Sequence, residues 1–229
     1  MVDGSVPEMN PQEDITRIRV LYTKGESLRF TGHLDMQRLW ERLLRRSGLP
    51  VRYSQGFHPR ARLNLASALP LGFVSQSELL DFWMNEPLPI NEIHARLSEA
   101  APPGLEIIEV SQAALSEDAL QVQMAASEFE VEFFDPQDAE ALNKKVGDFL
   151  AQDTIMRRRR KKVYDLRPLV LDINVIDRDN GDPSLQMKLK AEEGATGRPD
   201  EVLDEMGFEN TEYLVCRTAL ILTDNTPSI

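Results

Sequence analysis

Cysteine is nearly missing from this sequence, because Cys216 is its single occurrence among 229 residues. One thiol excludes a disulfide framework, a zinc site made of cysteines and an iron–sulfur cluster held by this chain alone. Long apolar runs are also missing, since none approaches the ~18–20 residues that a membrane span needs. The opening stretch, MVDGSVPEMNPQED, is acidic and polar, unlike a secretory signal. We therefore expect a soluble cytoplasmic protein that binds no membrane.

Positive charge is in the minority, with 26 Lys and Arg against 38 Asp and Glu and a net charge of −12. This balance disfavours a general nucleic-acid coat protein. The bases are nevertheless segregated, because residues 15–65 hold 11 of them and residues 155–170 hold 7, which together is 18 of the 26. Such clustering is typical of a basic patch on an acidic protein. The alternative, that acidic segments of the same chain neutralise both stretches, remains open.

The hydrophobic pattern predicts the same order of strands and helices twice. In the first half it predicts strands at residues 17–23, 51–54, 62–68, 78–84 and 105–110 and helices at residues 32–47 and 91–101. Thr31 is the expected N-cap of the first helix. In the second half it predicts strands at residues 128–134, 164–176, 185–191 and 215–222, a helix opened by Asp135 as N-cap with Pro136, and a helix opened by Pro199.

These elements define an expected fold class and domain organisation. We predict an α+β protein made of two tandem ferredoxin-like (βαββαβ) halves with antiparallel sheets. The expected division is a disordered acidic tail at 1–14, a first half at 15–110, a linker at 111–127, a second half at 128–223 and a tail at 224–229.

A set of specific residues adds a family resemblance. They are His33-Leu34-Asp35, Arg45-Arg46, Leu49-Pro50, Tyr53-Ser54, Gly56-Phe57, Pro59, Leu69-Pro70-Leu71-Gly72, Glu78, Asp81, Tyr164-Asp165-Leu166-Arg167-Pro168 and Gly197-Arg198-Pro199-Asp200-Glu201. On these residues, the chain from Ile15 to Leu222 resembles the radical-SAM-linked family. That family is a bacterial domain of unknown function found beside, or fused behind, cobalamin-binding radical SAM enzymes.

The resemblance implies a partner and a field of activity. It implies a radical SAM enzyme as partner, and RNA or ribosome-related work. Because this chain lacks the CxxxCxxC cluster of the radical enzyme, the resemblance implies an accessory protein. The chain departs from many relatives at Ala61 and at Asn64-Leu65, where Pro and Ser-Phe are expected, and these changes affect packing more than chemistry.

Two histidines are candidate catalytic or recognition residues. His33 stands at a predicted helix start, where an imidazole can act as a general base or donate to a phosphate. A packing role at the helix entry is the alternative. His58 lies in a turn that contains Gly56, and we expect Tyr53, Gly56, Phe57 and His58 to form a recognition loop. A plain structural turn explains the same residues equally well.

Arginines and lysines are the candidate anion and RNA contacts. Four of them, Arg38, Arg42, Arg45 and Arg46, share the polar face of the first predicted helix, and Arg60 follows the recognition loop. The others are Arg157, Arg158, Arg159, Arg160, Lys161, Lys162, Arg167 and Arg198. Six consecutive cations repel one another unless they are solvated or meet a polyanion. The alternatives are a solvated hairpin tip or pairing with acidic segments of the same chain.

No metal or cofactor site is expected, because the histidines and Asp35 lack metal-ligand spacing and neither GxSxG nor GxxxxGK[ST] occurs. The favoured interpretation is an accessory protein of a radical SAM enzyme that binds RNA or a ribonucleoprotein through basic patches. One alternative is a metal-independent RNA-processing endonuclease with His33 or His58 as general base. The other is a protein-only adaptor that docks on a partner enzyme.

Overall fold

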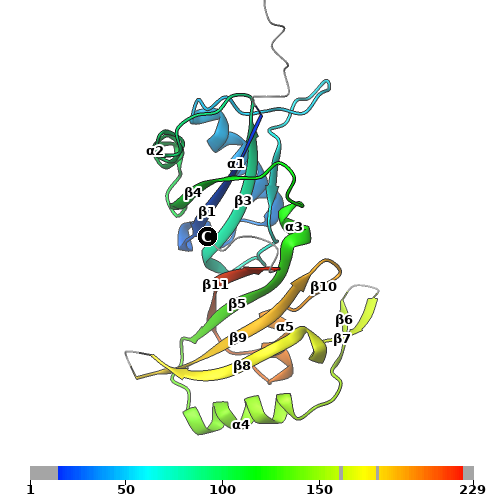
Figure 1. Ribbon diagram of the computed structural model, residues 1–229. Helices are drawn as coiled ribbons and strands as arrows, with labels where there is room; N and C mark the ends of the chain where they lie inside the picture. Colours follow the sequence, from blue (N-terminus) through cyan, green and yellow to red (C-terminus); the bar gives the residue numbers. More distant parts are fainter. Residues whose placement is uncertain (1–14, 160–161, 179–180, 224–229) are drawn as a thin grey trace, which may run out of the picture.

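One large sheet runs through the molecule (Figure 1), which a computed structural model describes at residues 15–159, 162–178 and 181–223. The sheet strands are β1 (Thr16–Lys24), β2 (Leu63–Leu65), β3 (Val74–Met84), β4 (Ile107–Ala113), β5 (Met124–Phe133), β8 (Val170–Asp177), β9 (Pro183–Glu192), β10 (Ala195–Thr196) and β11 (Tyr213–Leu222). Their order is β10-β9-β5-β11-β3-β1-β4, with β2 paired to β3 and β8 to β9. A separate hairpin pairs β6 (Met156–Arg159) with β7 (Lys162–Asp165).

Five α-helices accompany these strands within the described residues. They are α1 (His33–Arg46), α2 (Ile90–Ala100), α3 (Leu120–Gln123), α4 (Ala139–Leu150) and α5 (Pro199–Glu205), with 3₁₀ turns η1 (Glu26–Leu28) and η2 (Arg167–Leu169). All sheet pairings are antiparallel except that of β11 with β3. The expected α+β class with mostly antiparallel pairing is therefore confirmed.

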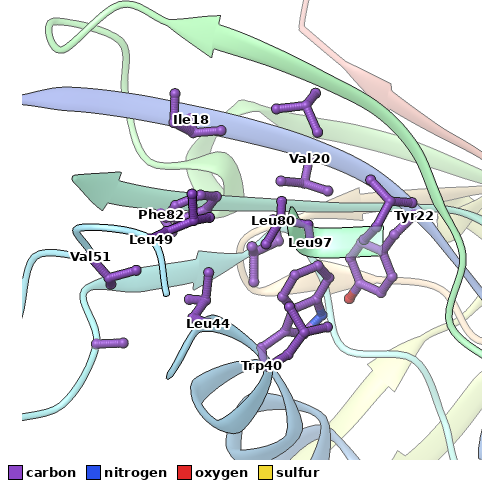
Figure 2. Close-up of a cluster of buried hydrophobic side chains, with 14 of the residues drawn as sticks. Ile18, Val20, Tyr22, Trp40, Leu44, Leu49, Val51, Leu80, Phe82 and Leu97 are labelled. Carbon is purple, nitrogen blue, oxygen red and sulfur yellow. The ribbon is translucent and has the colours of Figure 1, made fainter. Parts of the chain in front are cut away.

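The first half packs α1 and α2 against one face of β1, β3 and β4. Alternation places Ile18, Val20 and Tyr22 on the face that meets the helices. Figure 2 shows these side chains converging with those of α1, where Trp40 is fully buried. The Tyr22 and Trp40 rings meet edge to face at 4.8 Å, a favourable geometry for aromatic pairs.

The opposite face of the same strands holds a buried ionic cluster. Asp81 on β3 has no exposed surface and accepts hydrogen bonds from Arg17 and Arg19 on β1. The distances are 2.7 Å from Arg17 Nε and 2.9 Å from Arg19 Nε. Arg19 also pairs with Glu117, and Arg17 donates to three carbonyls of residues 114–118. These contacts satisfy charges that burial would otherwise disfavour.

The second half builds its own core from β5, β8, β9 and β11 with α4 and α5. Phe129, Val131 and Phe133 of β5 point into it, as their alternation predicts. Leu142, Val146 and Phe149 form the buried face of α4. The hairpin β6–β7 stands beside α5 and β10 at the edge of this half (Figure 1).

Strand β11 joins the two halves. It pairs antiparallel with β5 and, at Cys216 and Arg217, parallel with Val74 and Ser75 of β3. Arg217 is 2% exposed and donates to both carboxylate oxygens of Glu78, at 2.8 and 3.0 Å. It also donates to the Ala68 carbonyl at 3.0 Å. A single buried side chain therefore ties the last strand to the first half.

Several local expectations need correction. Helix α1 is capped by Gly32, not Thr31, and Gly32 offers no side-chain acceptor. Helix α4 begins at Ala139, and its N-cap is Asp138, whose Oδ1 accepts from the Ala141 amide at 2.8 Å. Asp135 and Pro136 precede that helix. The side chain that accepts from an otherwise unpaired amide of the first turn stands three residues after Asp135, at Asp138.

The remaining differences concern strands and the expected linker. The strand predicted at residues 164–176 is divided into the end of β7, the 3₁₀ turn η2 and β8, and the strand predicted at residues 62–68 is reduced to β2. Residues 51–54 form only isolated bridges, of Val51 with Met84 and of Tyr53 with Ala61. The segment 111–127 holds the end of β4, all of α3 and the start of β5. The proposed division into two domains and two tails stays a prediction, and residues 1–14 and 224–229 lie outside the described residues.

A candidate anion-binding cleft

The six-cation run supplies three residues of β6 and the first residue of β7, and alternation along these strands places its side chains on two faces of the hairpin. Opposite residues of an antiparallel pair share a face, so Arg157 and Tyr164 lie with Arg159 and Lys162 on one side. On that side Arg157 pairs with Asp204 at 3.1 Å and with Glu205 at 3.3 Å. Arg159 pairs with Glu201. Two of the six cations of the run are thus paired with acids of α5, which is the alternative that charge alone left open.

The rest of the run is exposed or lies outside the described residues. Arg158 and Lys162 are exposed and make no ion pair with any residue described in the structure. Arg160 and Lys161 lie outside the described residues. Two apolar side chains, Met156 and Val163, are 63% and 58% exposed.

Two adjoining cavities lie between the hairpin, the end of β9 and the start of α5. The inner cavity has a volume of about 310 Å³, and its lining residues are Ser67, Ala68, Leu69, Pro70, Ser127, Phe129, Arg159, Lys190, Ala191, Thr196, Gly197, Arg198, Pro199 and Arg217. The outer cavity has a volume of about 350 Å³, and its lining residues are Arg159, Lys162, Tyr164, Asp165, Leu169, Gly194, Ala195, Thr196 and Arg198. Because Arg159, Thr196 and Arg198 line both, we call the two together the cationic cleft.

The cleft concentrates positive charge. Among the described residues, four cations and no carboxylate line the inner cavity. Lys162 joins Arg159 and Arg198 in the outer cavity, where Asp165 is the single acidic lining residue. Four of the five cleft cations also have a carboxylate partner that lies outside the lining, and these pairs are Arg159–Glu201, Lys190–Glu192, Arg198–Asp200 and Arg217–Glu78. The cavity walls of this acidic chain therefore present mainly cationic side chains, with their acids behind them. Walls of low dielectric strengthen the attraction of such a cleft for anions.

A hydrogen-bonded network fixes the arginines at the boundary of the two cavities. Arg159 donates from Nε to Glu201 at 2.8 Å and from Nη2 at 2.6 Å, and Tyr164 donates to the same carboxylate. Arg198 donates from Nε to Asp200 at 2.9 Å and from Nη2 at 2.6 Å. A guanidinium carries five N–H donors, so each arginine retains its Nη1 donors for a ligand.

This network shifts the titration of its members. Burial, together with the hydrogen bond to Glu201 and the charge of that carboxylate, raises the pKa of Tyr164 to about 12, while Arg159 opposes the change. Burial acts against ionisation of Glu201, but the hydrogen bonds from Arg159 and Tyr164 outweigh it and lower the Glu201 pKa. The bidentate contact with Asp200 raises the pKa of Arg198, which remains charged at any physiological pH.

Gly197 allows the loop that carries Arg198 to approach the cleft closely. A Cβ at this position would lie 2.9 Å from the Leu169 carbonyl oxygen and 3.1 Å from the Leu189 Cβ. Both neighbours are backbone or buried, so neither can move freely. The glycine therefore sets the distance between the loop, η2 and β9, and with it the width of the cleft.

Behind the inner cavity lies a buried cluster with unequal charges. The side chains of Arg217 and Lys24 are 2% and 1% exposed. Glu78 is the buried carboxylate that pairs with Arg217 and whose charge also acts on Lys24. Burial lowers the pKa of Lys24; the Glu78 charge acts in the opposite direction, and the Arg217 charge lowers it further. Lys24 donates to the carbonyls of Arg29 and Phe73. The Arg217 Nε has no acceptor among the described residues.

The arginines of α1 lie in the other half of the molecule. Arg42 and Arg45 are exposed. Arg38 pairs with Asp35 on the surface, and Arg46 donates to the Ala100 carbonyl at 2.6 Å. None of the four lines the cleft, so the structure does not unite this face with the hairpin. Their assignment as phosphate contacts stays a prediction.

The candidate recognition loop and the histidines do not line the cleft, although His33 lines a small cavity that shares Ser67 and Leu69 with the inner cavity. Tyr53, His58 and Arg60 are exposed, Phe57 is fully exposed, and Gly56 has a φ of +141° that favours glycine. His33 is exposed at the start of α1. Arg167 donates to the carbonyls of Val170 and Leu150, which joins η2 to the end of α4.

Sequence reasoning missed Lys190 and Arg217 as members of the cleft. Both lie in strands with an alternating pattern, in which a charged residue is typical of an ordinary solvent-facing position. One signal was nevertheless present. Three segments that carried the family resemblance, beginning at Leu69, Tyr164 and Gly197, all contribute lining residues to the cleft. Glu78 and Asp81, from the same set, instead hold buried arginines.

Within the described residues, no helix is long and apolar enough to cross a membrane. No group of three His, Cys, Asp or Glu side chains in those residues has a metal-binding arrangement. Cys216 is half-buried, and burial raises the pKa of its thiol.

The molecule is thus a mixed α+β protein with a cationic cleft on an acidic chain. It belongs to the family described as "uncharacterized protein conserved in bacteria (DUF2344)", which matches residues 17–199. The description agrees with the expected bacterial domain of unknown function. No curated protein matches the sequence significantly.

Comparison with solved structures finds matches of low sequence identity. A Cbf5-Nop10-Gar1 complex matches with 9% identity and a TM-score of 0.47 over 93% of this chain and 50% of that one. The archaeal box H/ACA sRNP Nop10-Cbf5 complex matches with 9% identity and a TM-score of 0.44 over 90% and 47%. A putative glycine cleavage system transcriptional repressor matches with 10% identity and a TM-score of 0.25 over 91% and 99%. This chain spans about half the length of the first two, and these values support no conclusion about it.

Proposed function

We propose that this protein is a cytoplasmic accessory protein that binds RNA or a ribonucleoprotein at the cationic cleft. The observation that carries the proposal is the set of five cations that line the cleft, whose paired carboxylates lie outside the lining, on a chain with a net charge of −12. Contacts with phosphates supply most of the affinity of proteins for nucleic acid, and they require such a local reversal of charge.

The radical SAM enzyme is proposed as the partner on the sequence resemblance alone. We further propose that each half is a ferredoxin-like unit. Two observations support this: the strand order β4-β1-β3-β2 in the first half and β11-β5-β9-β8 in the second, each with antiparallel neighbours and two principal helices. The two orders are equivalent when strands are counted from the start of each half.

The geometry of the cleft disfavours an endonuclease that uses His33 or His58 as general base, because neither histidine lines the cleft. A general base must reach the proton that it removes, within about 3 Å or through one water. RNA cleavage by the purified protein would revive that alternative. Tight binding of a partner protein that ribonuclease treatment leaves unchanged would instead support a protein-only adaptor.

The test is binding of the purified protein to total cellular RNA across a salt series. A variant with Lys190→Ala and Arg198→Ala removes two cleft cations. A control with Arg96→Ala and Lys144→Ala removes the same charge from α2 and α4, outside the cleft.

The proposal predicts a difference between the two variants. Each phosphate contact on a single strand contributes about 0.7 to the slope of log affinity against log salt, so the cleft variant should flatten that slope by about 1.4. The control should keep the slope of the unmodified protein. No RNA binding at low salt, or equal losses in both variants, would overturn the proposal.

A further inference from the structure

The division of the cationic cleft into two unlike cavities carries an inference about what occupies it. The inner cavity is lined by four cations and no acid, together with Ser67, Ser127 and Thr196. The outer cavity adds a ring and apolar walls, from Tyr164, Leu169 and Ala195. One end of the cleft therefore suits a concentrated negative charge, and the other suits a flat group of mixed polarity.

The inner end keeps hydrogen-bond donors for an anion although each of its four cations has a carboxylate partner. Those partners are Glu201 for Arg159, Glu192 for Lys190, Asp200 for Arg198 and Glu78 for Arg217, and none of them lines the cavity. A guanidinium carries five N–H donors and an ammonium three, so a single carboxylate does not use them all. Lys190 and the Nη1 atoms of Arg159 and Arg198 therefore supply donors for a phosphate in the inner cavity.

The outer end has the features of a site for a nucleobase. Bases of single-stranded RNA stack on aromatic rings and on guanidinium planes. Arg159 lies over the Tyr164 ring at 5.1 Å, and this stacked pair lines the outer cavity. Asp165 uses Oδ1 to accept from the amides of Ile155 and Arg167, so Oδ2 remains an acceptor for an exocyclic amine.

The size of the cleft fits more than a phosphate. Its two cavities measure about 310 and 350 Å³ and share three lining residues. Small-molecule sites span about 300–1,000 Å³. A free phosphate would leave the outer cavity unused, whereas a nucleotide has one charged end and one flat end in the same order.

We infer that the cleft holds a single nucleotide unit, with its phosphate in the inner cavity and its base against Tyr164 in the outer cavity. The inference builds on the proposed RNA binding and names the part of the RNA that the cleft receives. Free nucleotides share this chemistry, so the experiment must separate the two sources.

The experiment is calorimetric titration of the full-length protein with cytidine 5′-monophosphate, cytidine and inorganic phosphate as probes. The nucleotide should bind at least tenfold more tightly than either of its parts. Two variants then separate the ends of the site. Lys190→Gln should weaken the nucleotide and phosphate and leave cytidine unchanged, whereas Tyr164→Ala should weaken the nucleotide and cytidine and leave phosphate unchanged.

Thermal unfolding of each variant shows that it folds. Tyr164→Phe, which keeps the ring and loses the hydrogen bond to Glu201, serves if the alanine variant does not fold, and it should retain the binding of cytidine. Equal effects of a variant on all three probes would contradict the two-part site.

Competition with a short single-stranded oligonucleotide separates this inference from the proposed function. Mutual displacement of oligonucleotide and nucleotide supports both. Salt-dependent RNA binding that the nucleotide does not displace overturns the inference and leaves the proposed function standing. Nucleotide binding without RNA binding supports the site for a free nucleotide and overturns the RNA proposal, and the lack of both overturns both.

Discussion

The buried ionic cluster at Asp81 allows a sharp test of the fold. Asp81→Asn keeps the size of the side chain and removes its charge. The carboxylate has no exposed surface and is the shared counterion of Arg17 and Arg19, which are 2% and 3% exposed. After the change, two guanidinium groups remain buried, and within the described part of the chain Arg19 alone retains an ion pair, with Glu117.

The expected loss follows from that burial. Breaking a buried pair by removal of one partner costs about 3–5 kcal/mol, because the other charge remains without compensation. For a chain of this size, that corresponds to a fall in Tm of about 6–20 °C. Thermal unfolding by circular dichroism measures the shift, and urea unfolding gives an independent midpoint.

A matched control separates burial from charge. Glu92→Gln on α2 also removes a carboxylate from an arginine, but its partner Arg96 is 41% exposed and Glu92 is 38% exposed. Surface pairs contribute about 0–1 kcal/mol, so Tm should change by no more than a few degrees. The reasoning is refuted if Asp81→Asn lowers Tm no more than Glu92→Gln does.

Three further predictions address the local structure. Gly197→Ala should lower Tm, because overpacking costs about 1–3 kcal/mol, whereas Gly147→Ala in open space within α4 should raise stability by up to about 1 kcal/mol; equal effects would contradict the close approach at Gly197. Asp138→Ala should cost about 1 kcal/mol in urea unfolding and Asp135→Ala almost nothing, unless the cap is misassigned. The Tyr164 phenol should ionise near pH 12 in ultraviolet titration, with its stabilisation complete below pH 10 and lost as the pH rises through 12; ionisation near 10 would contradict the contact with Glu201.

The sequence could predict periodicity but not partners. Alternation in β5 and the spacing of apolar residues in α1 predict which side chains are buried, because each depends only on neighbours in the chain. The six-cation run shows the limit. Its charge is evident from the sequence. Arg157 and Arg159, however, pair with acids of α5 that lie more than 40 positions later, and a pattern of neighbouring residues cannot predict such a contact.

The start of α4 shows a second limit. Asp135-Pro136 is the stronger N-terminal signal by composition, yet Asp138 is the cap because the chain continues from β5 for several residues before it turns. Only some of the cleft residues could be predicted from the sequence. Arg198 was a candidate from its loop, whereas Lys190 and Arg217 become site residues only when β9 and β11 take their places in the sheet.

The parallel pairing of β11 with β3 has a consequence for synthesis on the ribosome. The strands of the first half are synthesised long before Tyr213–Leu222. Glu78 therefore leaves the ribosome 139 positions ahead of its partner Arg217. Contacts of such separation form slowly. The inner cavity is therefore assembled last, and a nascent chain or a fragment that ends before Tyr213 lacks both the strand that joins the halves and the arginine at the back of the cleft.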